Sequence, residues 1–246
     1  MAFSRAILPL HRPDEEELTR AMAAIGMRFA AEPATEANIE DTLLFASEAG
    51  MEGDDLRVLS ILVTWFGVHA PWVNADRLVR ITREHPSDRV RALWSALGRW
   101  QSSDRRFARL VKVYEGARVD LLRVGTEFQL QRRGEDPRFE GSALRVPAGV
   151  LRDREGDVAD PKTLCRQHLA YRYRVMMGPS YRADMWAALE SDPDVSSADL
   201  ARRAYGSFAT AWQVRRDFAL VRGSDRPRLA PLVNRASRRT KRRAHG

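Results

Sequence analysis

This sequence has a single cysteine, no long apolar run and no recognisable secretory signal. The single cysteine, Cys165, excludes an intramolecular disulfide framework and is typical of a reducing compartment, so we expect a cytoplasmic protein. The longest apolar run, Val58 to Ala70, is interrupted by polar residues and is too short to cross a bilayer. The amino-terminal residues contain no small-residue cleavage site. These absences predict a chain without a membrane partner.

Catalytic and metal-binding motifs are missing too. Among the histidines only His168 stands at helical spacing from Cys165, and no second pair completes the three or four ligands of a zinc site. There is no G-x-S-x-G elbow, phosphate-binding glycine loop or H-E-x-x-H motif. Gly206-Ser207 resembles a nucleotidyltransferase motif, but the acidic residues Asp192 and Asp194 precede it, which is the wrong order. We therefore expect no enzyme, metal or cofactor, and interpret Cys165 as a buried thiol beside a core histidine.

The basic residues, by contrast, are concentrated at the carboxyl-terminal end, and nearly all of them are arginine. The net charge of the chain is +8. Residues 200–228 contain seven arginines against two aspartates, and residues 235–246 contain six basic residues and no acid. Residues 1–199 are therefore slightly acidic. Because a guanidinium group binds a phosphate or a guanine edge through two parallel hydrogen bonds, this distribution indicates a nucleic-acid partner.

The apolar periodicity predicts a mainly α-helical fold. Four segments carry apolar residues at three- and four-residue spacing, at residues 36–50, 54–69, 75–84 and 88–100, and the first three end at or shortly before glycine or proline. We assign them to a helical domain over residues 14–118. Residues 119–160 are rich in glycine and contain two internal prolines, which predicts an irregular connector with short strands. Residues 161–177 again show helical spacing.

Residues 199–218 predict two short helices joined by a turn. Ser196 is placed to cap the first helix and Ser207 the second. The residues at packing positions are small or apolar, namely Leu200, Ala201, Ala204, Ala211, Val214 and Phe218. The outward face of the second helix then holds Thr210, Gln213 and either Arg216 or Asp217. Glutamine binds an adenine edge and arginine a guanine edge, so this face is suited to reading bases.

ADLARRAYGSFATAWQVRRDF, residues 198–218, resembles the helix-turn-helix of bacterial winged-helix regulators. The preceding GPSYRADMWAALESD resembles the first helix of such domains, and RGSDRPR, between apolar residues 219–221 and 229–233, is similar to the tip of a wing. The resemblance implies a winged helix-turn-helix domain over residues 161–234, followed by a basic, disordered tail over residues 235–246. The sequence departs from the family pattern at Tyr205-Gly206, where the family has glycine and then an apolar residue.

The resemblance implies that the second helix enters the major groove of double-stranded DNA while the wing and the tail contact phosphates. The predicted DNA-binding residues are Arg202, Arg203, Ser207, Thr210, Gln213, Arg216, Arg222, Arg226, Arg228, Arg238, Arg239, Lys241, Arg242 and Arg243. Phe208 and Trp212 are unusually bulky for such a helix. They could instead pack against the upstream domain or a partner protein.

A weak internal repeat supports a further hypothesis about the amino-terminal domain. VNADRLVRIT, residues 73–82, aligns without a gap on VSSADLARRA, residues 195–204. The repeat predicts a second winged-helix-like unit over residues 54–115, closed by a hairpin; the segment after residue 104 could be a strand or a last helix. An ordinary helical bundle is the alternative.

Together these patterns favour a sequence-specific protein that binds double-stranded DNA, such as a prokaryotic transcriptional regulator or the autorepressing regulator of an antitoxin or phage-defence locus. The amino-terminal helices would bind a second copy, forming a homodimer, or a partner protein. The alternative is a non-catalytic interaction component of a defence or nucleic-acid-associated complex. Six tryptophans in the chain favour that alternative, because tryptophan is enriched at protein interfaces.

Overall fold

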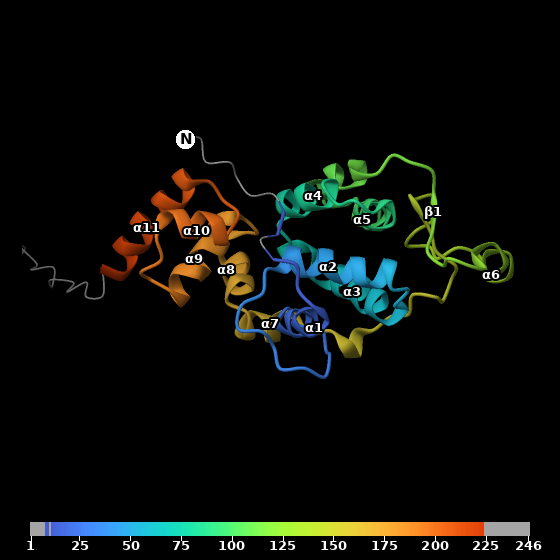
Figure 1. Ribbon diagram of the computed structural model, residues 1–246, viewed down its shortest axis with the longest axis horizontal. Coiled ribbons are helices and arrows are strands. Elements are labelled where there is room, and N and C mark those ends of the chain that lie inside the picture. Colours follow the sequence, from blue (N-terminus) through green and yellow to red (C-terminus); the bar gives the residue numbers. More distant parts are fainter. Residues whose placement is uncertain (1–7, 10, 224–246) are drawn as a thin grey trace, which may run out of the picture.

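The computed structural model describes residues 8, 9 and 11–223, which are mainly α-helical, as the periodicity predicts (Figure 1). The amino-terminal helices are α1 (Glu15–Ala24), α2 (Ile39–Glu52), α3 (Leu56–His69), α4 (Ala75–Arg83) and α5 (Asp88–Trp100). The described chain is elongated, with α9, α10 and α11 at one end and α6 at the other (Figure 1). None of its helices is both long and apolar enough to traverse a bilayer.

Short polar side chains determine where these helices begin. Asn38 caps α2, Asp55 caps α3 and Asn74 caps α4, each by accepting a hydrogen bond from a backbone N–H in the first turn. Ser87 does the same for α5. These caps satisfy donors that have no partner within the helix. The predicted helices are therefore observed with shifts of a few residues at their ends.

A large apolar cluster holds the amino-terminal helices together and extends from Leu18 to Tyr171. Its largest fully buried side chains include Trp65 and Trp94. Both indole N–H groups have partners, because Trp65 Nε1 donates to the carbonyl of Ile25 (2.7 Å) and Trp94 Nε1 donates to Ser47 Oγ (2.9 Å). The core thus buries large aromatic surface without leaving these donors unsatisfied.

The hairpin predicted to close a second winged-helix-like unit over residues 54–115 is not formed. After α5 the chain makes two 3₁₀ turns, η2 (Arg105–Arg109) and η3 (Val111–Val113), which are neither a strand nor a longer helix. Helices α3, α4 and α5 also share one apolar cluster with α2 rather than forming a unit of their own. The ordinary helical bundle therefore describes these residues.

Residues 119–160 contribute to the same core. They contain β1 (Val119–Asp120) and β2 (Leu144–Arg145), which pair in parallel, and the intervening helix α6 (Thr126–Arg133) projects from the end of the molecule (Figure 1). Phe139, Leu144 and Val146 are buried in the amino-terminal cluster. The short strands are as predicted, but the segment packs as part of the bundle.

The carboxyl-terminal helices are α7 (Pro161–Gln167), α8 (Leu169–Met177), α9 (Tyr181–Ser191), α10 (Ser197–Arg203) and α11 (Phe208–Gly223). The helix predicted over residues 161–177 is divided at His168, whose Nδ1 accepts a hydrogen bond from the backbone N–H of Tyr171 (3.1 Å) and caps α8. Leu164 and Tyr171 belong to the amino-terminal cluster. A second, smaller cluster joins α9, α10 and α11.

The first strand of the predicted wing is wrong. Residues 219–221 continue α11 as helix, and the exposed side chains of Leu220 and Val221 lie on it. A run of three apolar residues is too short to distinguish a strand from a helix by pattern. The rest of the predicted wing, residues 224–234, lies outside the described residues.

Candidate nucleic-acid interface

Helices α10 and α11 are joined by a tight turn and capped at both predicted positions. Ser196 Oγ accepts a hydrogen bond from the backbone N–H of Asp199 (3.1 Å), and Ser207 Oγ accepts one from the backbone N–H of Thr210 (3.1 Å). The Ser196 hydroxyl also donates to the Asp199 carboxylate (2.6 Å). That hydrogen bond and the nearby Arg202 lower the pKa of Asp199.

The six residues predicted to brace the two helices are all buried in the smaller cluster, with Met185, Leu189 and Val195 from the preceding segment. Three of the six come from the first helix and its carboxyl-terminal end, and three from α11. Ala201 and Ala204 allow the first helix to approach its neighbours closely because their side chains are small. The predicted packing of this helix pair is therefore confirmed.

The turn between α10 and α11 has a left-handed residue that is not glycine. Tyr205 has φ +54°, a conformation that a bulky residue rarely adopts. At Gly206 a Cβ atom would lie 2.1 Å from Met185 Cε on α9. A larger residue here would displace the flexible end of the Met185 side chain, and the glycine stands one position later than in the family pattern.

The Tyr205 side chain reaches from the turn to the amino-terminal bundle. Its hydroxyl donates to Asp41 Oδ2 on α2 (2.6 Å), and the Arg77 guanidinium carbon lies 3.4 Å from the centre of its ring. Arg77 Nη2 also donates to Asp41 Oδ1 (2.6 Å). The strained backbone of Tyr205 is thus accompanied by a hydrogen bond and a cation–π contact that only this side chain makes here.

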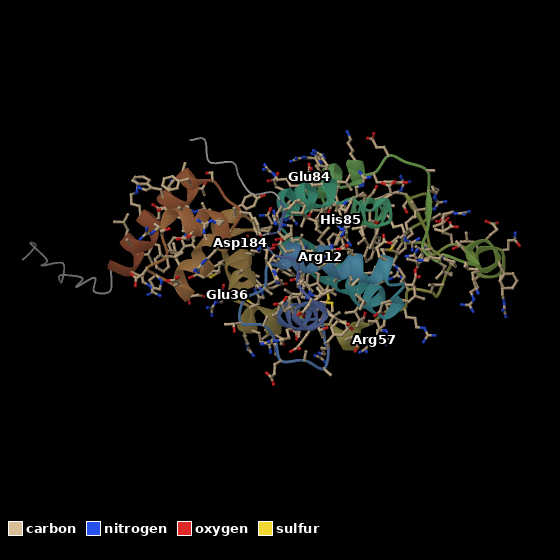
Figure 2. All side chains as sticks on the ribbon, in the orientation of Figure 1. Arg12, Glu36, Arg57, Glu84, His85 and Asp184 are labelled. Carbon is tan, nitrogen blue, oxygen red and sulfur yellow. The ribbon has the colours of Figure 1, made fainter. Side chains whose placement is uncertain are left out.

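A buried ionic cluster joins the same two parts of the molecule. Arg174 on α8 is 1% exposed, and its guanidinium donates to both Glu40 oxygens (2.6 and 2.8 Å) and to both Asp184 oxygens (2.7 and 2.9 Å). Glu40 lies on α2 and Asp184 on α9, and Figure 2 labels Asp184 where the two parts meet. We call Glu40, Asp41, Arg77, Arg174, Asp184 and Tyr205 the junction cluster.

Apolar packing at the junction is incomplete. A cleft of about 780 Å³ opens there between the bundle and the turn. Its wall includes Glu36 and Asp184, which Figure 2 labels. Much of the rest of its wall is alanine, including Ala37, Ala187 and Ala204. Small side chains leave this space unfilled, and the hydrogen bonds of the junction cluster connect the two parts beside it.

Burial in the junction cluster changes the protonation of its carboxyl groups. Three carboxyl groups, those of Glu40, Asp41 and Asp184, face only two guanidinium groups. Burial raises the pKa of Asp41 and of Asp184, although the neighbouring arginines act in the opposite direction. Exclusion of water therefore favours the neutral acid at these positions more than the adjacent positive charge opposes it.

The outward face of α11 resolves the choice between Arg216 and Asp217. The Arg216 side chain is 59% exposed, whereas Asp217 is turned aside and accepts a hydrogen bond from Arg182 Nη2 (2.7 Å). Gln213 is exposed, as predicted, while Thr210 is only half-exposed and shares a hydrogen bond with Ser207 through its hydroxyl (2.8 Å). Gln213 and Arg216 are the two predicted base-reading side chains that project into solvent.

Two large apolar side chains lie on the same outward face. Trp212 is 54% exposed and Leu220 is 68% exposed. The Arg216 guanidinium carbon lies 5.5 Å from the Trp212 ring centre. Helical spacing identifies the stripe Ala211, Val214 and Phe218 but not the outward-facing Leu220, because the resemblance to a wing places residues 219–221 after the helix.

The predicted arginines of α10 are engaged in surface ion pairs. Arg202 pairs with Asp199 (2.6 Å) and Arg203 with Asp192 (3.3 Å). On α11, Arg222 lies over the Phe218 ring at 5.0 Å. Exposed pairs of this kind are weak and are readily exchanged for a phosphate. These arginines therefore lie on the surface of the helix pair, and the contacts described here are surface contacts.

The remaining predicted residues lie outside the described part of the chain. They are Arg226, Arg228, Arg238, Arg239, Lys241, Arg242 and Arg243. Residues 178–223, which contain α9, α10 and α11, have six arginines and six acidic residues and are neutral. Residues 224–246 contain eight basic residues and one acid. The basic excess of the carboxyl-terminal end therefore comes from the segment that follows α11.

The histidines of the described chain have structural partners. His168 Nε2 bonds to the carbonyl of Ala37 (3.0 Å), and burial lowers the pKa of His168 to about 4. His69 contacts the Tyr171 hydroxyl (2.8 Å), and burial lowers its pKa to about 4 as well. Cys165 is half-buried rather than buried. Within the described residues no group of three or more histidine, cysteine or acidic side chains is placed to hold a metal.

Arg174→Met tests the junction cluster. The change leaves Glu40 and Asp184 buried without their cation, and we expect the free energy of unfolding to fall by about 3–5 kcal/mol. The matched control is Arg172→Met, which removes an exposed pair with Glu190 and should cost less than about 1 kcal/mol. Urea denaturation measures both. Equal losses for the two variants would contradict a special role for Arg174.

The raised pKa of Asp41 predicts a characteristic pH dependence. Below its ordinary pKa of 3.8 both folded and unfolded chains are protonated at Asp41, and above it only the folded chain holds the proton. The unfolding free energy of the wild type, relative to Asp41→Asn, should therefore fall as the pH rises above 3.8, until the folded pKa is passed. Urea denaturation of both proteins between about pH 4 and pH 7 measures this difference.

Asp199→Asn is the control of opposite sign. Because the pKa of Asp199 is lowered, its stabilising contribution is present above the ordinary pKa of 3.8 and is lost as the pH falls below it. The free energy of unfolding of the wild type, relative to that of Asp199→Asn, should therefore increase as the pH rises towards 3.8. If the free energy of unfolding of the wild type, relative to that of Asp41→Asn, also increased with pH, the proposed effect of burial on the pKa of Asp41 would be refuted.

Comparison with known proteins gives no evidence about the function of the helix pair, which is therefore argued from its own residues and geometry. No protein-family model matches the chain. Neither a curated protein nor a solved structure matches it significantly.

Proposed function

We propose that the protein binds double-stranded DNA through α10 and α11, with α11 in the major groove. The single observation that carries the proposal is the outward face of α11, where Gln213 and Arg216 project into solvent from a helix whose preceding turn is anchored to the bundle. These two side chains have the donors and acceptors that discriminate base edges. The Asp217 carboxylate, which would repel phosphate, is drawn aside by Arg182.

The arginines of α10 and the basic residues after α11 complete this proposal. Arg202 and Arg203 would exchange their surface carboxylates for backbone phosphates, and residues 224–246 would add sequence-independent phosphate contacts. Anchoring of the turn supports specific binding, because a helix already held in position loses less conformational entropy when it docks. The helix-turn-helix assignment belongs to the same proposal and rests on the resemblance of residues 198–218, whereas a wing would have to begin after α11 ends at Gly223.

A regulatory role follows from such binding. We propose a prokaryotic transcriptional regulator, including the autorepressing regulator of an antitoxin or phage-defence locus, acting in the cytoplasm. The amino-terminal bundle would bind a second copy or a partner protein. No enzymatic step is part of this proposal.

One observation favours a second candidate function. Trp212 and Leu220 expose apolar surface on the outward face of α11, and exposed tryptophan is common at protein interfaces. In that case the helix pair would bind a protein within a larger complex, and Gln213 and Arg216 would contribute to its polar rim. The two candidates differ in the salt dependence of binding and in the effect of changing these two residues.

Gln213→Ala and Arg216→Ala distinguish the candidates. The probe is the pool of duplex fragments that the full-length protein retains from sheared genomic DNA, sequenced for a shared motif. We expect each variant to weaken binding of the motif-bearing fragments by about 1–3 kcal/mol. Arg132→Ala, on the opposite end of the molecule, is the control and should bind like the wild type.

Salt titration of the same fragments separates base reading from general attraction. Deletion of residues 235–246 should weaken all fragments similarly and reduce the dependence of affinity on salt. A pool without a shared motif, or affinities that Gln213→Ala and Arg216→Ala leave unchanged, would rule out sequence-specific reading by α11. Binding that disappears only with the deletion would indicate electrostatic attraction alone.

A further inference from the structure

The outward face of α11 combines hydrogen-bonding and apolar side chains in neighbouring positions. Trp212 is 54% exposed and lies beside the exposed Gln213. Ala209, also exposed, precedes Trp212 by three residues and Gln213 by four, so all three share one side of the helix. An apolar group therefore flanks the side chain that is best suited to an adenine edge.

The chemistry of the major groove limits what Trp212 can contact there. Base edges present hydrogen-bond donors and acceptors in this groove, and the apolar exception is the C5-methyl group of thymine. An indole ring pressed on the donors and acceptors would leave them without water or a partner, which is unfavourable. A thymine methyl, in contrast, gains by leaving water.

Positive charge accompanies the exposed indole. The Arg216 guanidinium carbon lies 5.5 Å from the Trp212 ring centre. Asp217 accepts a hydrogen bond from Arg182 (2.7 Å) and forms a longer ion pair with Arg216 (3.7 Å). The exposed indole is therefore bordered by a guanidinium group on the outward face of α11. This pairing of charge with apolar surface fits DNA better than an uncharged apolar partner.

We infer that Trp212, assisted by Ala209, contacts thymine methyl groups at an A·T step whose adenine is bound by Gln213. The inference rests on the proposed DNA binding and specifies its target as duplex containing A·T pairs at the centre of the α11 contact. Insertion of the indole between base pairs would also bury it, but that requires the pairs to unstack. Methyl contact leaves the duplex intact.

Replacing thymine by uracil tests the inference, because it removes only the C5-methyl group. The probe is the fragment pool retained by the full-length protein, amplified once with dTTP and once with dUTP. We expect the wild type to bind the uracil fragments more weakly, by about fourfold for each thymine methyl group that Trp212 or Ala209 would otherwise cover. Trp212→Ala should bind both kinds of fragment more weakly than the wild type, and its preference for the thymine fragments should be smaller by the share that the indole contributes.

Phe128→Ala is the matched control, since it removes an exposed aromatic ring from α6 at the opposite end of the molecule. It should discriminate thymine from uracil like the wild type. The inference is overturned if the wild type binds both fragments equally, or if Trp212→Ala discriminates between them as strongly as the wild type does. In both cases the fragments remain bound and the proposed function stands. Failure to retain any fragment would overturn the proposed function, and this inference with it.

Discussion

The arrangement of the carboxyl-terminal helices depends on one buried guanidinium group. Arg174 bonds both to Glu40 in the amino-terminal bundle and to Asp184 on α9, and none of the three side chains is more than 10% exposed. Such a cluster adds little net stability compared with apolar packing, but a broken pair leaves a buried charge without a partner. We therefore interpret the cluster as a contact that selects one relative position of the two parts, and not as a large net contribution to the free energy of unfolding.

The turn between α10 and α11 is part of the same constraint. Tyr205 adopts a left-handed backbone, and its side chain contacts Asp41 and Arg77 on the bundle. The bundle thereby holds the first residues of α11, and with them the direction in which Gln213 and Arg216 project. A change that loosened the junction would alter the presentation of this face without touching it. This gives the amino-terminal bundle a route to influence the DNA binding that we propose for α11.

Local signals in the sequence predict the helices well and the junction not at all. Asn74 and Ser87 mark helix starts because their side chains satisfy backbone donors, and the stripe Ala211, Val214 and Phe218 identifies the buried face of α11. Periodicity treats polar residues as exposed, so it could not identify the buried pairing of Arg174 with Glu40. Residues of one junction that lie more than a hundred positions apart meet only through the tertiary fold.

A double-mutant cycle between Tyr205→Phe and Asp41→Asn tests most directly whether the turn is anchored to the bundle. The free energies of unfolding of the wild type, both single variants and the double variant would be measured by urea denaturation. Because the two groups share a buried hydrogen bond, the effects should be non-additive by about 0.5–3 kcal/mol. Additive effects would show that Tyr205 and Asp41 do not interact, and would contradict the anchoring of α11 by the amino-terminal bundle.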